Sequence, residues 1–247
     1  IKGFTVQTLA SDTAASAIDA GSWSSGGSLN VARRNLAGAG TQTAGLAFGG
    51  EATPGNTADT EEYNGSSWAE GGDMGTTRKQ LSGCGTQTAG LAFGGATPSL
   101  TAATEEYDGS SWTAGGNLGT ARKLLGAAGT QTAGLGFGGE GPGPTNSATE
   151  EYDGSSWTSG GALNTARQDL GGAGTQTAGL AFGGSTVPPN TANTEKYDGS
   201  SWTEVNNMNT ARYAVRGAGT QTAALAFGGS PGPTETESWD GTSWSTV

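Results

Sequence analysis

Three pairs of adjacent glutamates are the first candidates for acid and base chemistry, in the segments 61–62, 105–106 and 150–151. Glycoside hydrolysis requires two carboxylates that flank the scissile bond within one cleft. Neighbouring residues on a strand point to opposite faces of the sheet, so the two members of a pair cannot form such a dyad. Because the pairs recur along the chain, we interpret them as structural or solvent-facing strand positions; a catalytic site would break the repetition.

The residue types present limit the remaining catalytic chemistries. The sequence has no histidine, which excludes histidine-based acid and base catalysis, Ser-His-Asp triads and histidine-ligated metals. Cys84 is the single cysteine, and we expect a small buried residue with no redox role. No loop has the repeated aspartates of a calcium site. We therefore predict no enzyme activity, no catalytic residue, no metal and no cofactor; a hydrolase acting through the loop carboxylates Glu51, Asp59 and Glu140 ranks last.

An arginine recurs at the same interval as the glutamates. A ring of guanidinium groups near one face would bind an acidic ligand. Every copy carries the arginine, however, so we favour a structural role in which each arginine pairs with a carboxylate or a carbonyl of its own or the next unit. The five positions are Arg33, Arg78, Arg122, Arg167 and Arg212.

Two residues depart from the repeated pattern. Arg216 occupies a slot that holds a small residue in the other copies, and we interpret it either as a ligand contact or as the adaptation of a terminal unit. Lys196 stands where three other copies have glutamate, and we expect neutral surface variation there. The small residues in the slot of Arg216 are Ala37, Ser82, Gly126 and Gly171.

The composition limits both the fold and the partners. Apolar residues make up 32% of the 247 residues and charged residues 13%, with 47 glycines, so short strands and many turns fit better than a helical bundle. The net charge is −11 and the basic residues do not gather into a stripe, which argues against nucleic acid or an anionic membrane as partner. No run of about 18 apolar residues is present, so we expect no membrane span. The chain begins at Ile1 without a signal-like segment, and we expect a processed product or part of a longer protein.

The elements that position these residues repeat with a period of about 45 residues. The segment "GTQTAGLAFGG" begins at Gly40 and recurs four more times with small changes, and "TEEYDGSSW" or a variant follows each copy. Alternation in "GLAF" and "TEEY", the Asp-Gly turn signal and the closing glycines predict four short strands joined by tight turns in each unit. The tryptophans that open the fourth strand are Trp68, Trp112, Trp157, Trp202 and Trp244.

This pattern resembles the kelch repeat. The shared features are an arginine that opens the unit, a double glycine that ends the second strand, a Tyr-Asp in the third strand and a tryptophan that opens the fourth. The units depart from the family in a first strand of glycine and alanine and in a second strand reduced to "GLAF". The resemblance implies a β-propeller of four-stranded antiparallel blades around an axis, with the first strand of each blade innermost.

On this basis we predict an all-β fold in which residues 1–247 form a single kelch-like β-propeller domain with five complete repeats. The N-terminal residues align without gaps with the end of a unit, which places Trp23 in the slot of Trp112. This partial sixth copy lacks an innermost strand. We favour a six-bladed ring, completed by a strand from outside this stretch, over a five-bladed ring with an extra N-terminal sheet. The predicted units are 1–32, which is partial, and 33–77, 78–121, 122–166, 167–211 and 212–247.

Small and aromatic side chains explain how so glycine-rich a chain forms a core. Innermost strands converge on the axis, so the "GAG" of residues 38–40 lets neighbouring backbones approach closely. We expect Leu46, Phe48, Tyr63 and Trp68 and their counterparts to fill the space between blades, where one aromatic side chain buries roughly 150–250 Å².

The copies differ mainly in the loop between the second and third strands, which holds all eight prolines. In a propeller this loop emerges on the same face as the connection between blades, so one face is variable and the other is nearly uniform. Function in repeat proteins tends to lie on variable loops, although drift of unselected loops gives the same pattern. The candidate ligand-binding residues are Asn56, Thr57, Asn146, Ser147, Asn190, Thr191, Asn193 and Arg216.

We therefore predict a non-enzymatic binding module that presents variable loops to a glycan or a protein surface. The near-identical repeats also resemble kelch-type repeats in tail-fibre and other virion proteins of marine bacteriophages. That resemblance implies a virion or extracellular location, receptor recognition or decoration of the particle, and other virion proteins as partners; a homo-oligomer is compatible with it. The alternative is a structural module whose uniform face docks onto a larger assembly.

Overall fold

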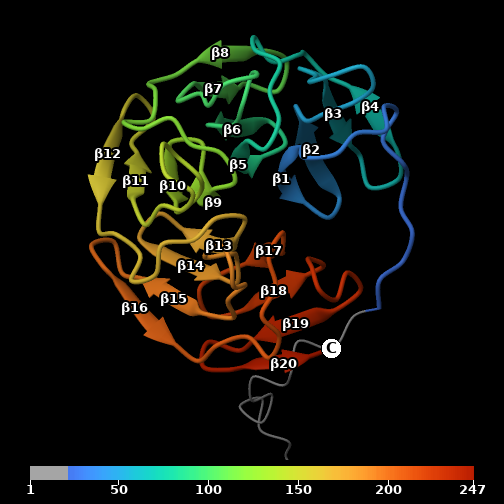
Figure 1. The fold of residues 1–247 in the computed structure, drawn as a ribbon. Helices are drawn as coiled ribbons and strands as arrows, with labels where there is room; N and C mark the ends of the chain where they lie inside the picture. Colours follow the sequence, from blue (N-terminus) through green and yellow to red (C-terminus); the bar gives the residue numbers. More distant parts are fainter. Residues whose placement is uncertain (1–21) are drawn as a thin grey trace, which may run out of the picture.

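The computed structural model describes residues 22–247, which fold into five four-stranded sheets around a common axis (Figure 1). Each sheet is an antiparallel meander whose strands follow chain order from the axis to the rim. The predicted all-β propeller with four-stranded blades is therefore confirmed. The described residues contain no helix long and apolar enough to cross a membrane.

The blades are numbered in chain order, with four strands in each. Blade 1 contains β1 (Ala37–Thr41), β2 (Ala44–Phe48), β3 (Thr60–Tyr63) and β4 (Trp68–Glu70). Blade 2 contains β5 (Ser82–Thr86), β6 (Ala89–Phe93), β7 (Thr104–Tyr107) and β8 (Trp112–Ala114). Blade 3 contains β9 (Gly126–Thr130), β10 (Ala133–Phe137), β11 (Thr149–Tyr152) and β12 (Trp157–Gly160). Blade 4 contains β13 (Gly171–Thr175), β14 (Ala178–Phe182), β15 (Thr194–Tyr197) and β16 (Trp202–Val205), and blade 5 contains β17 (Arg216–Gly219), β18 (Ala224–Phe227), β19 (Thr236–Trp239) and β20 (Trp244–Thr246).

Glycines set the points where the chain leaves a strand. The double glycine after β2 has φ values of +62° at Gly49 and +109° at Gly50. A Cβ on Gly50 would lie 2.8 Å from the carbonyl oxygen of Arg34, so the backbone conformation and the close approach both require glycine. In the turn from β3 to β4, Gly65 has a φ of +93°, which explains the repeated Asn-Gly and Asp-Gly dipeptides.

The prediction of six blades is wrong, because the structure contains five. Residues 22–32 of the partial N-terminal unit form no strand. The rest of that unit lies outside the described residues. The partial copy lacks an innermost strand, and the second strand of a blade pairs with that strand. The sequence pattern that suggested a sixth blade therefore lacks one of the strands that a four-stranded sheet needs.

Aromatic side chains fill the junctions between successive blades. Where blade 2 meets blade 1, the ring of Trp112 packs on Phe48 with centroids 4.9 Å apart, and its Nε1 donates a hydrogen bond to Thr60 Oγ1 at 2.9 Å. The next three junctions repeat both contacts. Leu46 and Phe48 are buried, as predicted. These contacts form a core between blades that are themselves only one sheet thick.

Two hydrogen-bonded clamps join the same blades. Gln87 of blade 2 donates from Nε2 to the carbonyl oxygens of Gly45 and Tyr63 in blade 1, at 3.1 and 2.7 Å. The Tyr107 hydroxyl donates to Glu62 at 2.7 Å. Burial, together with the neighbouring carboxylate, raises the pKa of Tyr107 to about 12, so the phenol stays a donor. The clamps recur at Gln131, Gln176 and Gln221 and at Tyr152 and Tyr197.

The recurring arginine is buried and pairs with the first glutamate of its own blade. Arg122 Nη2 lies 2.7 Å from Glu150 Oε1, and Nη1 donates to the carbonyl oxygens of Gly138 and Ala148 at 2.7 and 2.8 Å. The second glutamate, Glu151, accepts a tyrosine hydroxyl of the next blade. The arginine thus pairs with a carboxylate and carbonyl groups of its own unit, which is the pairing that the structural interpretation expects. The other pairs are Arg33 with Glu61, Arg78 with Glu105, Arg167 with Glu195 and Arg212 with Glu237.

Glycine in the innermost strands of blades 2, 4 and 5 lets each approach the preceding blade, as predicted for this slot, whereas among the described residues a Cβ on Gly38 of blade 1 would meet only its own blade. A Cβ on Gly172 would lie 2.4 Å from the carbonyl oxygen of Ala127 in the preceding blade. A Cβ on Gly217 would lie 2.3 Å from the ring of Phe182. Either contact is closer than packed atoms allow, so these positions exclude side chains.

Lys196 is part of a compensated pair, so the expectation of neutral surface variation is wrong. Blade 5 replaces the clamp tyrosine with Trp239, and blade 4 replaces the opposing glutamate with Lys196. The Lys196 ammonium lies 5.4 Å from the centroid of the Trp239 ring and donates to the carbonyl oxygen of Gly241 at 2.6 Å. An indole ring has no hydroxyl to offer a carboxylate, but its face attracts a cation.

Blades 5 and 1 do not form a junction of this kind. They lie apart, bridged at the rim by the N-terminal segment (Figure 1). Trp23 packs on Phe227 of blade 5 with centroids 5.3 Å apart and donates to Thr236 Oγ1 at 3.0 Å, as the tryptophan of a following blade does elsewhere. A Cβ on Gly45 of blade 1 would meet only atoms of its own blade, whereas its counterparts would meet a leucine of the preceding blade. We call the region between blades 5 and 1 the open junction.

Removal of one buried arginine will destabilise the fold strongly. In Arg122→Met, Glu150 keeps a buried carboxylate without its ion-pair partner, so we expect the free energy of unfolding to fall by about 3–5 kcal/mol. Urea denaturation followed by circular dichroism measures this change. Arg34→Ala is the control, because the Arg34 side chain is 78% exposed and its ion pair contributes less than about 1 kcal/mol. Equal losses in the two variants would contradict the structural role.

The Lys196 and Trp239 substitutions will prove coupled in a double-mutant cycle. Lys196→Glu places a carboxylate against an indole, and Trp239→Tyr gives the lysine a smaller aromatic ring with a weaker cation–π attraction. The double variant recreates the tyrosine and glutamate of the inner junctions. Each variant's loss of unfolding free energy is measured by urea denaturation. We expect the sum of the two single-variant losses to exceed the loss in the double variant by about 1 kcal/mol or more. Strictly additive losses would show that the two residues act independently.

Candidate functional site

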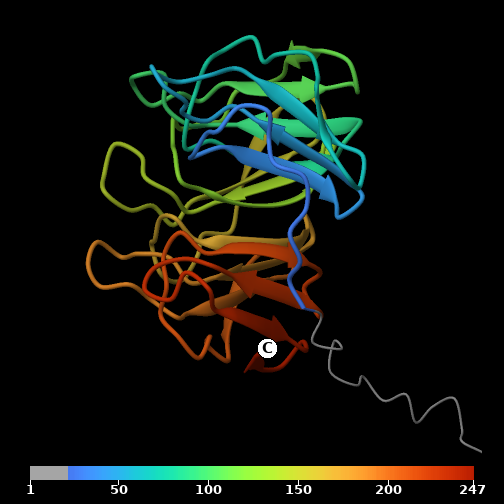
Figure 2. The same cartoon turned by 90° about the vertical axis from the view of Figure 1, so that its right-hand side faces the viewer.

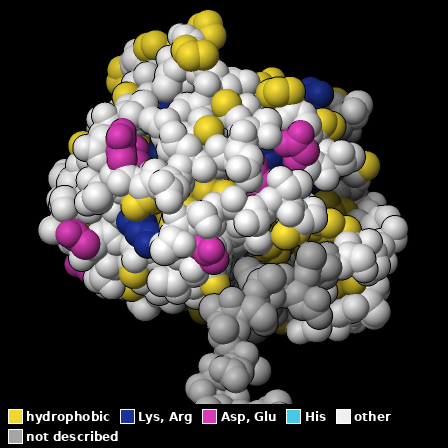
Figure 3. Space-filling model, turned by 90° about the horizontal axis from the view of Figure 1, so that it is seen from below, with side chains coloured by type: hydrophobic (Ala, Val, Ile, Leu, Met, Phe, Trp, Pro, Cys, Tyr) yellow, Lys and Arg dark blue, Asp and Glu magenta, His cyan; other side chains and the backbone are white. Residues whose placement is uncertain are grey.

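The two faces of the propeller differ in how much the blades vary. The loops between second and third strands project from one face, which we call the variable face (Figure 2). The hairpin turns between first and second strands and between third and fourth strands lie on the other, which we call the turn face. The side of the rim that Figure 3 draws is mostly uncharged, with isolated acidic and basic side chains. A site that differs between blades therefore belongs to the variable face.

A chain of backbone hydrogen bonds surrounds the axis on the variable face. One residue in each blade, two positions after the recurring arginine, has a φ between 53° and 57°. Its amide donates to the carbonyl oxygen of the preceding blade's residue, and the bonds run from blade 1 to blade 5 at 2.8–2.9 Å. A positive φ is uncommon for residues other than glycine, and these bonds hold it in place. The five residues are Asn35, Gln80, Leu124, Asp169 and Ala214.

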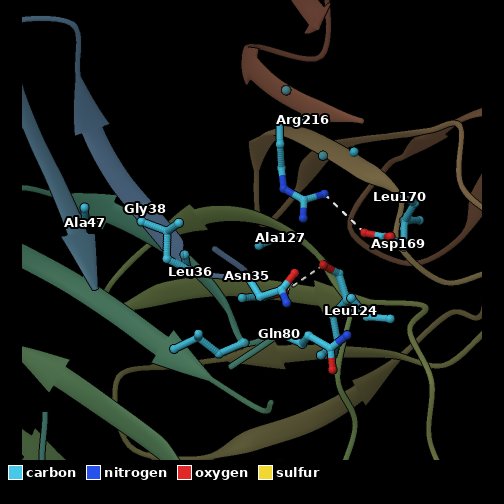
Figure 4. A pocket seen from close by; sticks show the side chains of 18 of the residues that line it. Asn35, Leu36, Gly38, Ala47, Gln80, Leu124, Ala127, Asp169, Leu170 and Arg216 are labelled. Atoms are coloured by element: carbon cyan, nitrogen blue, oxygen red, sulfur yellow. Dashed lines mark hydrogen bonds and ion pairs between the residues drawn. The ribbon is translucent and has the colours of Figure 1, made fainter. Parts of the chain in front are cut away.

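Most of these residues line a cavity of about 480 Å³ on the axis (Figure 4). Asn35, Gln80 and Asp169 contribute polar side chains. The neighbouring residue in blades 1 to 4 is a leucine that also lines the cavity. An apolar wall with a few polar groups is the usual composition of a ligand site. The lining leucines include Leu36, Leu81, Leu124, Leu125 and Leu170.

Arg216 faces Asp169 at the wall of this cavity (Figure 4). Its Nη1 lies 3.4 Å from Asp169 Oδ1, and its side chain is 54% exposed. Among the described residues that line the cavity, these two are the only charged groups. A Cβ on Gly171, in the same slot of blade 4, would lie 2.2 Å from the buried ring of Phe182. Phe227 of blade 5 is only half-buried, so the open junction gives Arg216 the room that its counterparts lack.

Ion pairs on the variable face tie further cations to loop carboxylates. Glu51 pairs with Arg34 at 3.1 Å and with Lys79 at 2.8 Å, and Glu140 pairs with Lys123 at 3.3 Å. The hydrogen bond from Lys79 and then that from Arg34 lower the pKa of Glu51. A carboxylate with a lowered pKa stays ionised near neutral pH, so Glu51 is poorly suited to donate a proton.

Two of the predicted loop residues join neighbouring loops. Asn56 Nδ2 donates to the carbonyl oxygen of Ala96 at 3.2 Å, and Asn190 Nδ2 donates to that of Ser230 at 3.4 Å. Each bond connects the loop of one blade to the loop of the next. These amides support the variable face rather than project from it.

Five more predicted residues make hydrogen bonds within their own loop or to the connection between blades. Thr57, Thr191 and Asn146 each accept the amide of the residue two positions further on. Asn193 donates to a threonine of the connection between blades, and the carbonyl oxygen of Ser147 accepts an amide there. Of the eight candidate residues, the structure brings only Arg216 to the axial cavity.

The cavity residues Asn35, Gln80 and Asp169 escaped the sequence analysis. A signal was present, because the slot two residues after the recurring arginine holds five different residues: Asn35, Gln80, Leu124, Asp169 and Ala214. The proline-containing loops vary more conspicuously than this single slot. Only the fold shows that the slot lies at the axis.

The turn face repeats one polar motif. The carboxylate of Asp153 accepts the amides of Ser155 and Ser156 and the Ser155 hydroxyl, at 2.7–2.8 Å. The Ser155 hydroxyl, followed by the two amides, lowers the pKa of Asp153 to about 2. Asn64 makes the same backbone bonds in blade 1. The equivalent aspartates are Asp108, Asp198 and Asp240.

No protein-family model matches the chain, and no curated protein matches it with significant similarity. Within residues 22–247, no three His, Cys, Asp or Glu side chains cluster as metal ligands do. Cys84 is buried, as expected, and burial raises the pKa of its thiol to about 12. The chemistry that the site supports therefore follows from the axial cavity and its surroundings.

The aspartate turns will contribute to acid sensitivity. Because folding lowers the pKa of these carboxylates from about 4 to about 2, they stabilise the fold above pH 4 and lose this effect as the pH falls toward 2. A variant with asparagine at 108, 153, 198 and 240 retains the turn bonds seen at Asn64. We expect its melting temperature to fall less between pH 4 and pH 2 than that of the unaltered chain, measured by thermal circular dichroism. The same fall in both proteins would contradict a role for these turns.

Proposed function

We propose that the chain is a non-enzymatic binding module that recognises a glycan or a protein surface through its variable face. The observation that carries this proposal is the axial cavity, whose lining residues differ from blade to blade within an otherwise repeated scaffold. Two of the exposed large hydrophobic side chains, Val187 and Tyr213, also lie on this face. Exposed aromatic and apolar side chains on the face that also carries a cavity with a few polar groups are typical of recognition surfaces.

The turn face is less suited to recognition or docking. Its aspartates and serines hydrogen-bond within their own turns, and the motif repeats from blade to blade. A module that docks through this face would need an apolar patch to bury. The large hydrophobic side chains that are exposed among the described residues are Trp23, Val187, Tyr213 and Val247, none of which belongs to a hairpin turn. This distribution favours the binding module over the purely structural alternative.

The charge arrangement also favours binding over hydrolysis. Hydrolysis by two carboxylates requires a pair that shares one cleft. Among the described residues that line the cavity, Asp169 is the only carboxylate. Glu51 and Glu140 are each held in ion pairs with lysine or arginine.

The kelch resemblance extends the proposal to the protein's setting. Each blade places the opening arginine, the double glycine and the tryptophan of the kelch pattern in equivalent structural positions. The likeness of the repeats to those of bacteriophage virion proteins supports a role in a tail fibre or on the particle surface. A virion or extracellular location, with a receptor and other virion proteins as partners, belongs to this proposal.

A glycan array will test the binding role. We expect the purified chain to bind a restricted set of glycans. In the test variant, residues 51–59 carry the blade 3 loop "EGPGPTNSA" and residues 185–193 carry the same loop, so loop lengths are kept. We expect weaker or altered binding, because the variable face changes while the strands remain. Asn64→Asp is the control, since it makes the blade 1 turn match the others and leaves the variable face intact.

The array also contains the outcome that would overturn the proposal. If the intact chain gives the circular dichroism spectrum of a folded β-protein and binds neither the glycans nor a panel of host surface proteins, the binding role fails. The structural alternative would then account for the fold.

A further inference from the structure

The axial cavity is asymmetric because it extends into the open junction. Leu29, Gly38 and Trp68 line it on the side of blade 1, and Arg216 and Gly217 line it on the side of blade 5. At the inner junctions, a phenylalanine of the preceding blade fills the corresponding space beside the innermost strand. A Cβ on Gly38 would meet only an oxygen of its own blade. The cavity thus has one wall that the repeated packing does not fill.

Trp68 on this wall has fewer aromatic neighbours than its counterparts. Its ring packs on Tyr63 with centroids 5.0 Å apart, and within the described residues it has no second aromatic neighbour. Trp112, in the same slot of blade 2, packs on both Tyr107 and Phe48. Phe227 of blade 5 is the equivalent of Phe48, but its ring packs on Trp23 and not on Trp68. One side of the Trp68 indole therefore lacks its usual partner where it borders the cavity.

The polar groups of the cavity carry no net charge. Arg216 and Asp169 oppose each other at 3.4 Å, and Asn35 and Gln80 add neutral amides. Together they offer both donors and acceptors. An anionic ligand would be attracted by Arg216 and repelled by Asp169. A cationic ligand would be attracted by Asp169 and repelled by Arg216. A neutral ligand with several hydroxyls can use all four groups.

We propose that the axial cavity binds one neutral sugar ring, of the hexose or N-acetylhexosamine class, between Trp68 and the Arg216–Asp169 pair. The apolar C–H face of the sugar packs against the indole and the leucine wall, and its hydroxyls bond to Asp169, Arg216 and the amides of Asn35 and Gln80. This inference rests on the proposed binding role and names the ligand class for it. The cavity volume of about 480 Å³ lies within the range of small-molecule sites.

Titration of the full chain with methyl glycosides tests the inference. The probes are the methyl glycosides of glucose, galactose, mannose and N-acetylglucosamine, with N-acetylneuraminic acid and glucuronic acid as anionic comparisons. Binding is measured by tryptophan fluorescence and by saturation-transfer NMR. We expect at least one neutral sugar to bind at millimolar concentration or below, with an affinity that changes little with added salt.

The variants use residues that other blades already carry. Arg216→Gly introduces the glycine that blades 3 and 4 carry in this slot, and Asp169→Ala introduces the alanine that blade 5 carries in the slot of Asp169, so we expect both variants to fold. We expect each to weaken sugar binding by about tenfold or more. Trp68→Phe should reduce the fluorescence change on binding. Asp153→Asn, which removes a carboxylate from the turn face, is the matched control and should bind as the unaltered chain does.

The outcomes separate this inference from the proposed function. Binding of neutral sugars that Arg216→Gly and Asp169→Ala leave unchanged would overturn the cavity as the site, while the binding role would stand. Binding of the acidic sugars alone, weakened by salt, would overturn the neutral ligand class. If the chain binds glycans on the array but none of these single sugars, the inference is overturned. If the chain binds no glycan on the array and no protein partner, the proposed function itself is overturned.

Discussion

The inner junctions between blades depend on a large aromatic ring of one blade that fits against glycine, or in one blade alanine, in the innermost strand of the next. The ring of Phe182 occupies the place where a Cβ on Gly217 would lie, and the tryptophan of the following blade covers the phenylalanine from the rim. Both demands, the ring and the glycine, act where blade 2 meets blade 1, where blade 4 meets blade 3 and where blade 5 meets blade 4; blade 3 carries Ala127 in this slot, and the Phe93 ring of blade 2 lies where a Cβ on Gly136 would be. They explain how a chain with 32% apolar residues and 47 glycines forms a core: the few large side chains lie between blades, and glycine makes room for them.

The polar interactions follow from this packing. The carbonyl groups at the two ends of the loop between the second and third strands of a blade lie in this packed region, and they need donors. Arg122 and its counterparts supply these donors while pairing with a glutamate of the same blade. The clamp formed by tyrosine and glutamate is interchangeable with that of Trp239 and Lys196, because each supplies a matched polar contact across the junction.

The open junction gives the molecule its chemical asymmetry. Five similar blades in equivalent contacts would surround the axis with similar residues. Where blades 5 and 1 do not pack together, Phe227 is half-buried, Trp68 has one aromatic neighbour among residues 22–247, and Arg216 lies beside the axis. The candidate site therefore lies where the repeated packing stops.

The sequence alone determined the strands, the order of the blades and the structural role of the arginines and paired glutamates, because these depend on local patterns that recur in every unit. It could not determine the number of blades, since a partial copy of the pattern around Trp23 does not show whether a sheet forms. Nor could it show that Asn56 and Asn190 serve the scaffold while Asn35 and Asp169 line a cavity, because their partners lie in other blades. Those assignments depend on contacts between residues far apart in the chain, which only the tertiary structure decides.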